Sequence, residues 1–365
     1  MADAFLANGK RPEPARQAWR WMRANLFGGV FSSIATLLAV YLIARAGWAL
    51  ADWAVIHAVW SAPDGRACIA ASGGKGACWA FLGYWARFIL FGRYPYAEQW
   101  RPLVVVVLFV ALLLASCARR LLGWRIAVLW LAGIAINLVL MAGGVAGLEP
   151  VGTDRWSGLP LTLILAIVGL ALAFPLAIVL ALARRSSMPA VRALAVAYIE
   201  LVRGVPLITV LFMASVMLPL FLPAGVTVNN LLRAQLGFVL FYAAYLAEVV
   251  RGGLQAIPKG QEEAADALGL GFGRKMALVI LPQALKIAIP PLVNVLIAGF
   301  KDTTLVTIIG LFDLMSTAAN AITDPRWRGF YPEAYAFVAV IYFAFCFFMS
   351  RYSQALERSL AGGRR

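Results

Sequence analysis

The chain has 365 residues, of which 62% are hydrophobic and 13% are charged. Soluble domains carry about a quarter charged residues, so this composition excludes an ordinary water-soluble enzyme. The 32 lysines and arginines outnumber the 17 acidic residues, but they stand in short clusters between long uncharged blocks. Such clusters are typical of loops facing the cytoplasmic leaflet and do not form a nucleic-acid-binding surface. The sequence therefore predicts a membrane protein.

Apolar stretches long enough to cross a bilayer recur along the chain. A spanning helix needs about 20 residues, because each residue adds only about 1.5 Å. We expect an all-α, multi-pass membrane protein of about eight transmembrane helices, a count that could differ by one. The apolar run 81–90 is short and has arginines within and beside it, so an interfacial or re-entrant piece is predicted there. The predicted spans are 26–46, 100–117, 126–145, 159–182, 206–222, 231–250, 289–309 and 334–350.

The positive charges predict the orientation of these spans. Most of them fall on one side of the membrane when the N-terminus is placed in the cytoplasm. The positive-inside rule then places both termini in the cytoplasm and the segment 47–99 outside. No cleavable signal peptide is expected, because the first apolar run is as long as a true span and no small-residue cleavage site follows it.

The outer segment contains two of the four cysteines, Cys68 and Cys78. A disulfide between them can form in an oxidising compartment, but their positions in the sequence leave open whether it does. His57 is the single histidine, and no CxxC or HExxH spacing occurs. A bound catalytic metal is therefore not expected.

The spans carry few groups that could drive transport. Ionisable side chains are almost absent from their central stretches, which disfavours coupling to protons. No GxxxxGK[ST] motif for nucleotide binding occurs in the chain either. If the chain takes part in active transport, we expect the energy to come from another polypeptide.

The cytoplasmic segment 255–285 is the polar insertion that could receive this energy. A proline followed by acidic residues fits the start of a short helix, which Gly269 or Gly271 can end in the left-handed conformation. A second short helix is predicted over 274–281, ending at Pro282. Physics alone leaves two roles open: an interfacial hairpin that covers the bundle, or a docking element for a partner's groove.

This loop resembles the signature loop of the membrane subunits of ABC importers. That signature reads Glu-Ala-Ala, three residues, Gly, nine residues, Ile, one residue and Leu-Pro. The chain keeps every spacing and departs only by a valine in place of isoleucine. The matching positions are Glu263, Ala264, Ala265, Gly269, Val279, Leu281 and Pro282.

Further segments are similar to the polar amino-acid branch of these permeases. The resemblance covers 156–352 and implies a five-helix importer core. The preceding 1–155, with three further spans and the outer loop, resembles the extensions of the general L-amino acid permeases. The remaining 353–365 is predicted to be a basic cytoplasmic tail. The segments that carry the resemblance begin at Gly158, Glu200, Ala247 and Lys301.

The resemblance implies an assembly in the bacterial inner membrane. A second, non-identical permease subunit would complete the pathway, and a periplasmic protein would deliver the L-amino acid. Two copies of a separate ATPase would bind ATP and Mg, so no cofactor is expected in this chain, nor any nucleic-acid partner. Carried over by position, Glu263, Ala264, Ala265 and Gly269 would form the coupling helix in the ATPase groove. The chain itself would hydrolyse nothing.

Charged residues near the membrane are assigned structural roles first. Lys301 and Asp302 interrupt an apolar run, and we expect an ion pair that fixes a helix break; contact with a passing substrate is the alternative. Local pairs are also expected at spacing i, i+3. These pairs are Glu248 with Arg251 and Glu200 with Arg203.

Two other function classes compete with the importer subunit. A stand-alone, ion-coupled secondary amino-acid carrier would need no ATPase. A bilayer-embedded enzyme acting on lipid would need convergent histidine, cysteine or carboxylate groups, and the sequence offers no such set.

Overall fold

The computed structural model of the protein describes residues 14–117, 123–223 and 225–361. Within these ranges the chain is helical, and β-pairing is confined to isolated bridges. The chain divides into two compact units, Met1–Ala80 and Phe81–Arg365, which are described separately. This division follows packing, so the boundary after residue 155 that the family resemblance implies stays a prediction.

The first unit is built around one long apolar helix. That helix extends to Ile56 and is long and apolar enough to cross a membrane. Beyond it, Asp64 caps a short helix by accepting a hydrogen bond from the backbone N–H of Ala67. The helices are α1 (Pro14–Asn25), α2 (Val30–Ala51), which continues as the π-helical turn Asp52–Ile56, and α3 (Gly65–Ser72).

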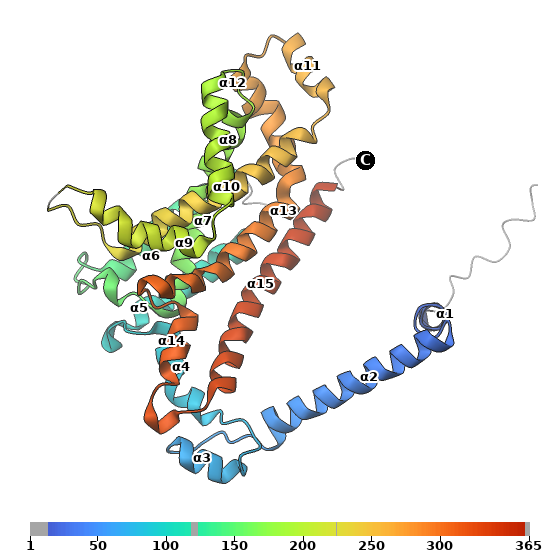
Figure 1. Cartoon of the computed structure of the whole chain (residues 1–365), viewed down its shortest axis with the longest axis vertical. Coiled ribbons are helices and arrows are strands. Elements are labelled where there is room, and N and C mark those ends of the chain that lie inside the picture. The colour runs from blue at the N-terminus through green and yellow to red at the C-terminus, as the bar shows by residue number, and fades with distance from the viewer. Residues whose placement is uncertain (1–13, 118–122, 224, 362–365) are drawn as a thin grey trace, which may run out of the picture. The chain divides into compact units, whose positions relative to one another are not determined.

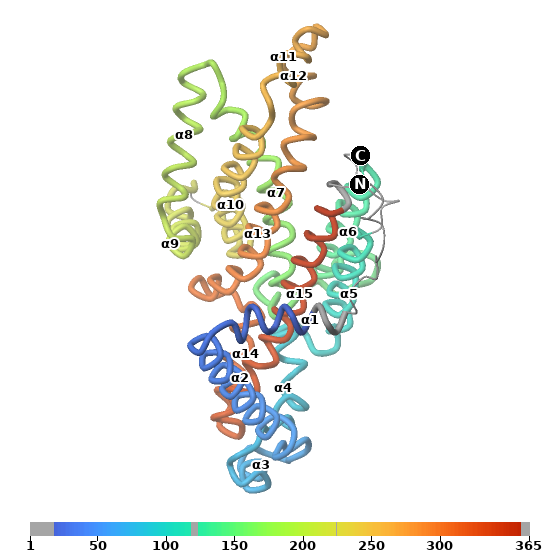
Figure 2. Tube along the Cα trace, turned by 90° about the vertical axis from the view of Figure 1, so that its right-hand side faces the viewer, coloured from blue at the N-terminus to red at the C-terminus, as the bar shows by residue number. Residues whose placement is uncertain are grey.

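The second unit contains the remaining helices. Figure 1 shows α11 and α12 at one end of this unit and α4 and α14 toward the other. Figure 2 shows α8 and α9 on one side of α10 and α13, and α5 and α6 on the other. The helices are α4 (Ala80–Phe91), α5 (Trp100–Ala115), α6 (Trp124–Ala142), α7 (Gly158–Arg184), α8 (Pro189–Arg203), α9 (Leu207–Phe212), α10 (Asn230–Gln255), α11 (Lys259–Ala267), α12 (Phe272–Lys275), α13 (Leu281–Asp302), α14 (Leu314–Ala321) and α15 (Tyr331–Ala361).

The predicted fold class is confirmed. Seven helices within the described residues are long and apolar enough to span a membrane, and an eighth is counted if α8 and α9 form one span. The apolar helix α4 has 12 residues and falls short of that length, as expected for 81–90. The tail predicted at 353–365 is helical as far as Ala361, and the rest lies outside the described residues.

The predicted span 206–222 is the helical stretch Leu207–Phe221, which is counted as a span only together with α8. α8 ends at Arg203, and α9 starts after Pro206 with its axis turned by 104°. Proline lacks a backbone N–H, and its ring disfavours helical geometry in the residue before it. The segment after α9 continues as π-helical and 3₁₀ turns as far as Phe221.

The core of the second unit forms where α7 and α10 pack along each other, with Leu165 and Phe238 fully buried. α13 packs against α10 and also contacts α7. At Gly253, α10 and α13 approach so closely that a Cβ would lie 2.5 Å from the carbonyl oxygen of Ala284. This contact fixes the start of α13, which directly follows the loop 255–285, against the core.

Candidate functional site: the loop 255–285

The loop 255–285 contains a short helix with a defined end. α11 ends where Gly269 adopts the left-handed conformation with φ +71°. The N–H of Leu270 donates to the carbonyl of Ala265 at 3.1 Å, and that of Gly269 donates to the carbonyl of Asp266 at 2.9 Å. This is the Schellman pattern, in which the left-handed residue lets the next N–H turn back to the helix. Gly269, and not Gly271, therefore ends the helix.

The second helix of the loop does not stop at Pro282, contrary to the prediction. α12 leads through the π-helical turn Met276–Ile280 directly into α13, so helical structure runs from Phe272 to Ile309. The wider π-helical turn shifts the hydrogen-bond register just before Pro282, where a proline has no N–H to donate. The loop thus consists of one short helix, α11, and a glycine turn that leads into the first turns of a long membrane-spanning helix.

The signature residues of α11 face two ways. Ala265 is buried against the protein, whereas Glu263 and Ala264 are exposed. Leu268 and Phe272, which flank the glycine turn, are 79% and 65% exposed. Sequence reasoning passed over Phe272, although an aromatic residue in a polar loop is the kind of signal that marks a contact surface. The exposed face combines the carboxylates of Glu263 and Asp266 with small and large apolar side chains.

The remaining signature residues lie on the helix that leads into α13. Val279 and Leu281 are half-buried and Pro282 is exposed. The side chain of Gln283 donates to the carbonyl of Val279 at 2.9 Å and to the side-chain oxygen of Gln261 on α11 at 3.0 Å. Gln283, which follows these residues, therefore links the start of α13 to α11.

Two ion pairs also hold α11 in place. Lys275 on α12 pairs with Asp266 at 2.7 Å, and Arg185, which follows α7, pairs with Glu262 at 2.9 Å. Glu262 is thus paired with a residue of its own chain, whereas the neighbouring Glu263 is exposed and makes no ion pair among the described residues. An exposed, braced helix of this kind is suited to contact a partner protein.

A family model named "Binding-protein-dependent transport system inner membrane component" matches residues 173–362, which include this whole loop. The chain belongs to this family. Full-length relatives support the assignment and identify the family as the permease subunits of ABC transporters.

The inner membrane amino-acid ABC transporter permease protein YhdY of Escherichia coli strain K12 is 46% identical to this permease. The match covers 100% of this chain and 99% of the relative. The glutamate/glutamine/aspartate/asparagine transport system permease protein BztC of Rhodobacter capsulatus is 40% identical, over 97% of each chain. A crystal structure of an amino acid ABC transporter with histidines is 33% identical, with a TM-score of 0.49 over 55% of this chain and 92% of that chain.

The permease carries an ionic cluster where the ends of α7, α8 and α10 meet. Glu248 pairs with Arg251 at 2.8 Å, as predicted from their spacing. The predicted pair of Glu200 with Arg203 is wrong: Glu200 pairs with Arg184 at 2.9 Å, and Arg203 lies 3.4 Å from Glu248. The reason is tertiary, because α7 and α10 bring closer partners to both side chains than their own helix does.

Lys301 and Asp302 do not form the expected ion pair in the described part of the chain. Instead, the hydroxyl of Tyr242 on α10 donates to the carboxylate of Asp302 at 2.6 Å. A helix change does occur here, because α13 ends at Asp302 and the chain continues as the 3₁₀ turn Thr303–Ile309. Contact of either residue with a passing substrate stays a prediction.

In the first unit, the sulfur atoms of Cys68 and Cys78 are bonded to each other, with the two Cα atoms 6.2 Å apart. The indole N–H of Trp79 donates to the carbonyl of Ala54 at 2.8 Å, which ties the segment after this bond to the end of the long helix. The sequence left open whether the two cysteines form a disulfide, and in the structure they do.

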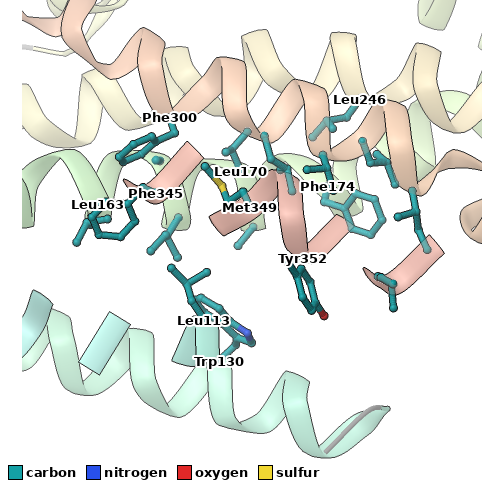
Figure 3. A pocket seen from close by; sticks show the side chains of 18 residues that line it. Leu113, Trp130, Leu163, Leu170, Phe174, Leu246, Phe300, Phe345, Met349 and Tyr352 are labelled. Atoms are coloured by element: carbon teal, nitrogen blue, oxygen red, sulfur yellow. The ribbon is translucent and has the colours of Figure 1, made fainter. Parts of the chain in front are cut away.

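An apolar groove of about 450 Å³ lies between α5, α6, α7, α13 and α15 of the second unit. Figure 3 shows Leu113 and Trp130 on one side of it, with Phe300 and Leu246 opposite. The lining side chains are aliphatic, aromatic or methionine, and the polar atoms of Trp130 and Tyr352 are hydrogen-bonded to Ser116. Such a lining offers no partner for the charged groups of a polar solute, so we assign the groove no role in transport.

Proposed function

We propose that this permease subunit carries L-amino acids through the bacterial inner membrane into the cytoplasm, driven by a separate ATPase that docks on α11. The observation that carries the proposal is the exposed, braced face of α11 at the signature positions of the family. The substrate class is supported by the relatives, both of which are named as amino-acid permeases.

The chemistry of the loop favours a protein partner over the membrane surface. Glu263 offers a carboxylate to a basic group in the partner's groove, and Ala264 is small enough to allow close approach. The exposed Leu268 and Phe272 supply apolar area that association would remove from water. In this assembly ATP and Mg bind to the ATPase, and this chain is moved by the conformational change of the ATPase.

The other partners follow from the family and from the exposed helices. A second, non-identical permease subunit completes the pathway, and a periplasmic protein delivers the amino acid from the side opposite to α11. Both termini then lie in the cytoplasm, in agreement with the distribution of positive charge.

Uptake into reconstituted vesicles tests the energy source. The permease is combined with its partner subunit, the ATPase and the binding protein, and uptake of a radiolabelled amino acid is measured with and without ATP. We expect uptake only with ATP, whether or not an ion gradient is present. Uptake that persists without ATP when a gradient is applied would identify a stand-alone secondary carrier instead.

A charge reversal at Glu263 tests the docking surface. If its carboxylate meets a basic group of the ATPase, Glu263→Lys should reduce co-purification of the ATPase by about tenfold, which corresponds to about 1.4 kcal/mol. Membrane insertion should stay normal, because the side chain is exposed and makes no ion pair within the described residues. Lys259→Gln, at an exposed position of the same helix, is the matched control. Unchanged co-purification of the Glu263 variant would assign this residue only to helix capping.

A further inference from the structure

Two consecutive arginines at the end of α7 reach in different directions. Arg185 pairs with Glu262 on α11 at 2.9 Å. Arg184 pairs with Glu248 on α10 at 2.7 Å and with Glu200 on α8 at 2.9 Å. These two adjacent residues therefore connect the coupling helix α11 to two further helices of the core, α8 and α10. None of these contacts could be read from local spacing.

The contacts of Arg184 belong to a compact ionic cluster. The Glu248 side chain is 14% exposed and lies within salt-bridge distance of Arg184, Arg203 and Arg251. Together with Glu200, the cluster contains three guanidinium groups and two carboxylates. Glu248 is therefore the group that keeps the three cations together, and its charge ties the inner ends of α7, α8 and α10 into one block.

The cluster lies next to the main break in the helical framework. Arg203 is the last residue of α8, directly before the 104° turn into α9. A force applied to the inner end of α8 is thus applied beside the point where the helix direction changes. Broken helices are places at which packed elements rotate relative to one another.

The pair of Arg185 with Glu262 is suited to transmit a movement rather than to hold the fold together. The two side chains are 36% and 35% exposed, so their attraction is weakened by solvent and adds little to stability. The other braces of α11, Lys275–Asp266 and Gln283–Gln261, lead only to the helix that follows it. Among the described ion pairs, Arg185–Glu262 alone joins α11 to α7.

We propose that Arg185 and Arg184 are positioning residues that carry the displacement of α11 into α7, α8 and α10, with Glu262 and Glu248 as their two partners. The proposal rests on the proposed function, because it takes the ATPase at α11 as the source of the displacement. It adds a second route by which the coupling helix acts on the core, besides its covalent connection to α13.

Charge-swapped variants test this route in reconstituted vesicles that contain the partner subunit, the ATPase and the binding protein. Arg185→Glu and Glu262→Arg should each raise the ATP hydrolysed per amino acid transported by at least about fivefold, the lower end of typical coupling between sites. The double variant, Arg185→Glu with Glu262→Arg, restores opposite charges and should return this ratio to within about twofold of wild type. Arg192→Glu, an exposed arginine of α8 without an ion pair in the described residues, is the control and should leave the ratio unchanged.

The ratio separates transmission from folding and from docking. A purely structural role would lower uptake and hydrolysis together, leaving the ratio at the wild-type value, and this result would overturn the proposal. Failure of the double variant to restore the ratio would also overturn it. Co-purification of the ATPase, measured in parallel, should stay within about twofold of wild type, because Glu262 is occupied inside the chain.

The inner cluster has its own test. Glu248→Gln leaves three arginines with one carboxylate, and we expect the same rise in ATP hydrolysed per amino acid, whereas Glu248→Asp keeps the charge and should recover most of the wild-type ratio. Equal ratios for both variants and wild type would contradict the role of the cluster. If wild type itself shows no ATP-dependent uptake, the proposed function fails first, so the two failures are distinguishable.

Discussion

At the scale of single residues, Arg101 shows how a fully buried cation is accommodated in the permease. It stands in the first turn of α5 with no exposed surface. Its guanidinium donates to the carbonyl of Leu140, in the last turn of α6, at 2.7 Å, and to that of Glu149, beyond this helix, at 2.8 Å. Tyr94 donates to the carbonyl of Met141 at 3.0 Å, and burial raises the pKa of this tyrosine to about 12, so it stays protonated. The end of α6 is thus capped by side chains from a distant segment.

Removal of this cap should destabilise the permease without altering the loop 255–285. Arg101→Ala leaves buried carbonyl groups without donors, so we expect the free energy of unfolding to fall by about 3 kcal/mol. Thermal unfolding of the detergent-solubilised protein measures this loss. Arg326→Ala is the control, because the Arg326 side chain is 62% exposed and its substitution should cost little. Equal melting temperatures for the two variants would contradict the assignment of Arg101 as a cap.

Gly269 illustrates a residue whose backbone conformation, and not its neighbours, limits substitution. Its φ is +71°, and a Cβ at this position would meet no atom within 4 Å. Valine is strongly disfavoured at positive φ, so Gly269→Val should force the turn to rearrange and displace the exposed face of α11. We expect uptake to fall at least about tenfold with normal membrane insertion, a loss equivalent to about 1.4 kcal/mol of coupling. Gly271→Val is the control, because Gly271 has an extended conformation with φ −65° and equally open surroundings; a similar loss there would refute the conformational explanation.

At the scale of helices, the start of α13 shows where sequence reasoning fails. Pro282 was expected to end a short helix, since proline cannot donate to the preceding turn. The π-helical turn Met276–Ile280 removes this conflict by changing the register before the proline. Two further prolines, Pro290 and Pro291, lie within the same helix. Neighbouring helices can compensate such residues in a membrane protein, and this compensation is not encoded in the local sequence.

The junction between α13 and the 3₁₀ turn offers a test of the two roles open for Asp302. Its hydrogen bond from Tyr242 favours the structural role. Asp302→Asn keeps an acceptor for the hydroxyl, so we expect unchanged abundance and substrate preference. Tyr242→Phe removes the donor and should lower stability by about 1–2 kcal/mol, measured by thermal unfolding. A changed substrate preference in Asp302→Asn, seen by competition between amino acids during uptake, would instead place this carboxylate in the substrate path.

At the scale of the whole molecule, the sequence predicts what depends on local composition. The spans could be located because each must contain enough consecutive apolar residues, and the loop 255–285 because its signature is short and continuous. Arg185 and Glu262, by contrast, are 77 positions apart, and Arg184 and Glu248 are 64 apart. Their pairing follows from tertiary packing, above all of α7 beside α10, which no local spacing reveals. The ion pairs around the candidate site could therefore be found only in the structure, whereas the signature residues on its exposed face were predicted from the sequence.

The proposed energy source requires that α11 lies in the cytoplasm, and the orientation of the second unit in the membrane can be tested. Cysteines can be placed at exposed positions on opposite sides by Asp154→Cys and Gly260→Cys, with Cys117 and Cys346 replaced by serine. A membrane-impermeant maleimide applied to spheroplasts should label the cysteine at position 154 and reach that at 260 only after permeabilisation. The parent protein without either new cysteine is the control, and it should stay unlabelled until a reductant opens the bond between Cys68 and Cys78. The reverse pattern would place α11 outside the cell, where a cytoplasmic ATPase cannot reach it, and would contradict the proposed coupling at its root.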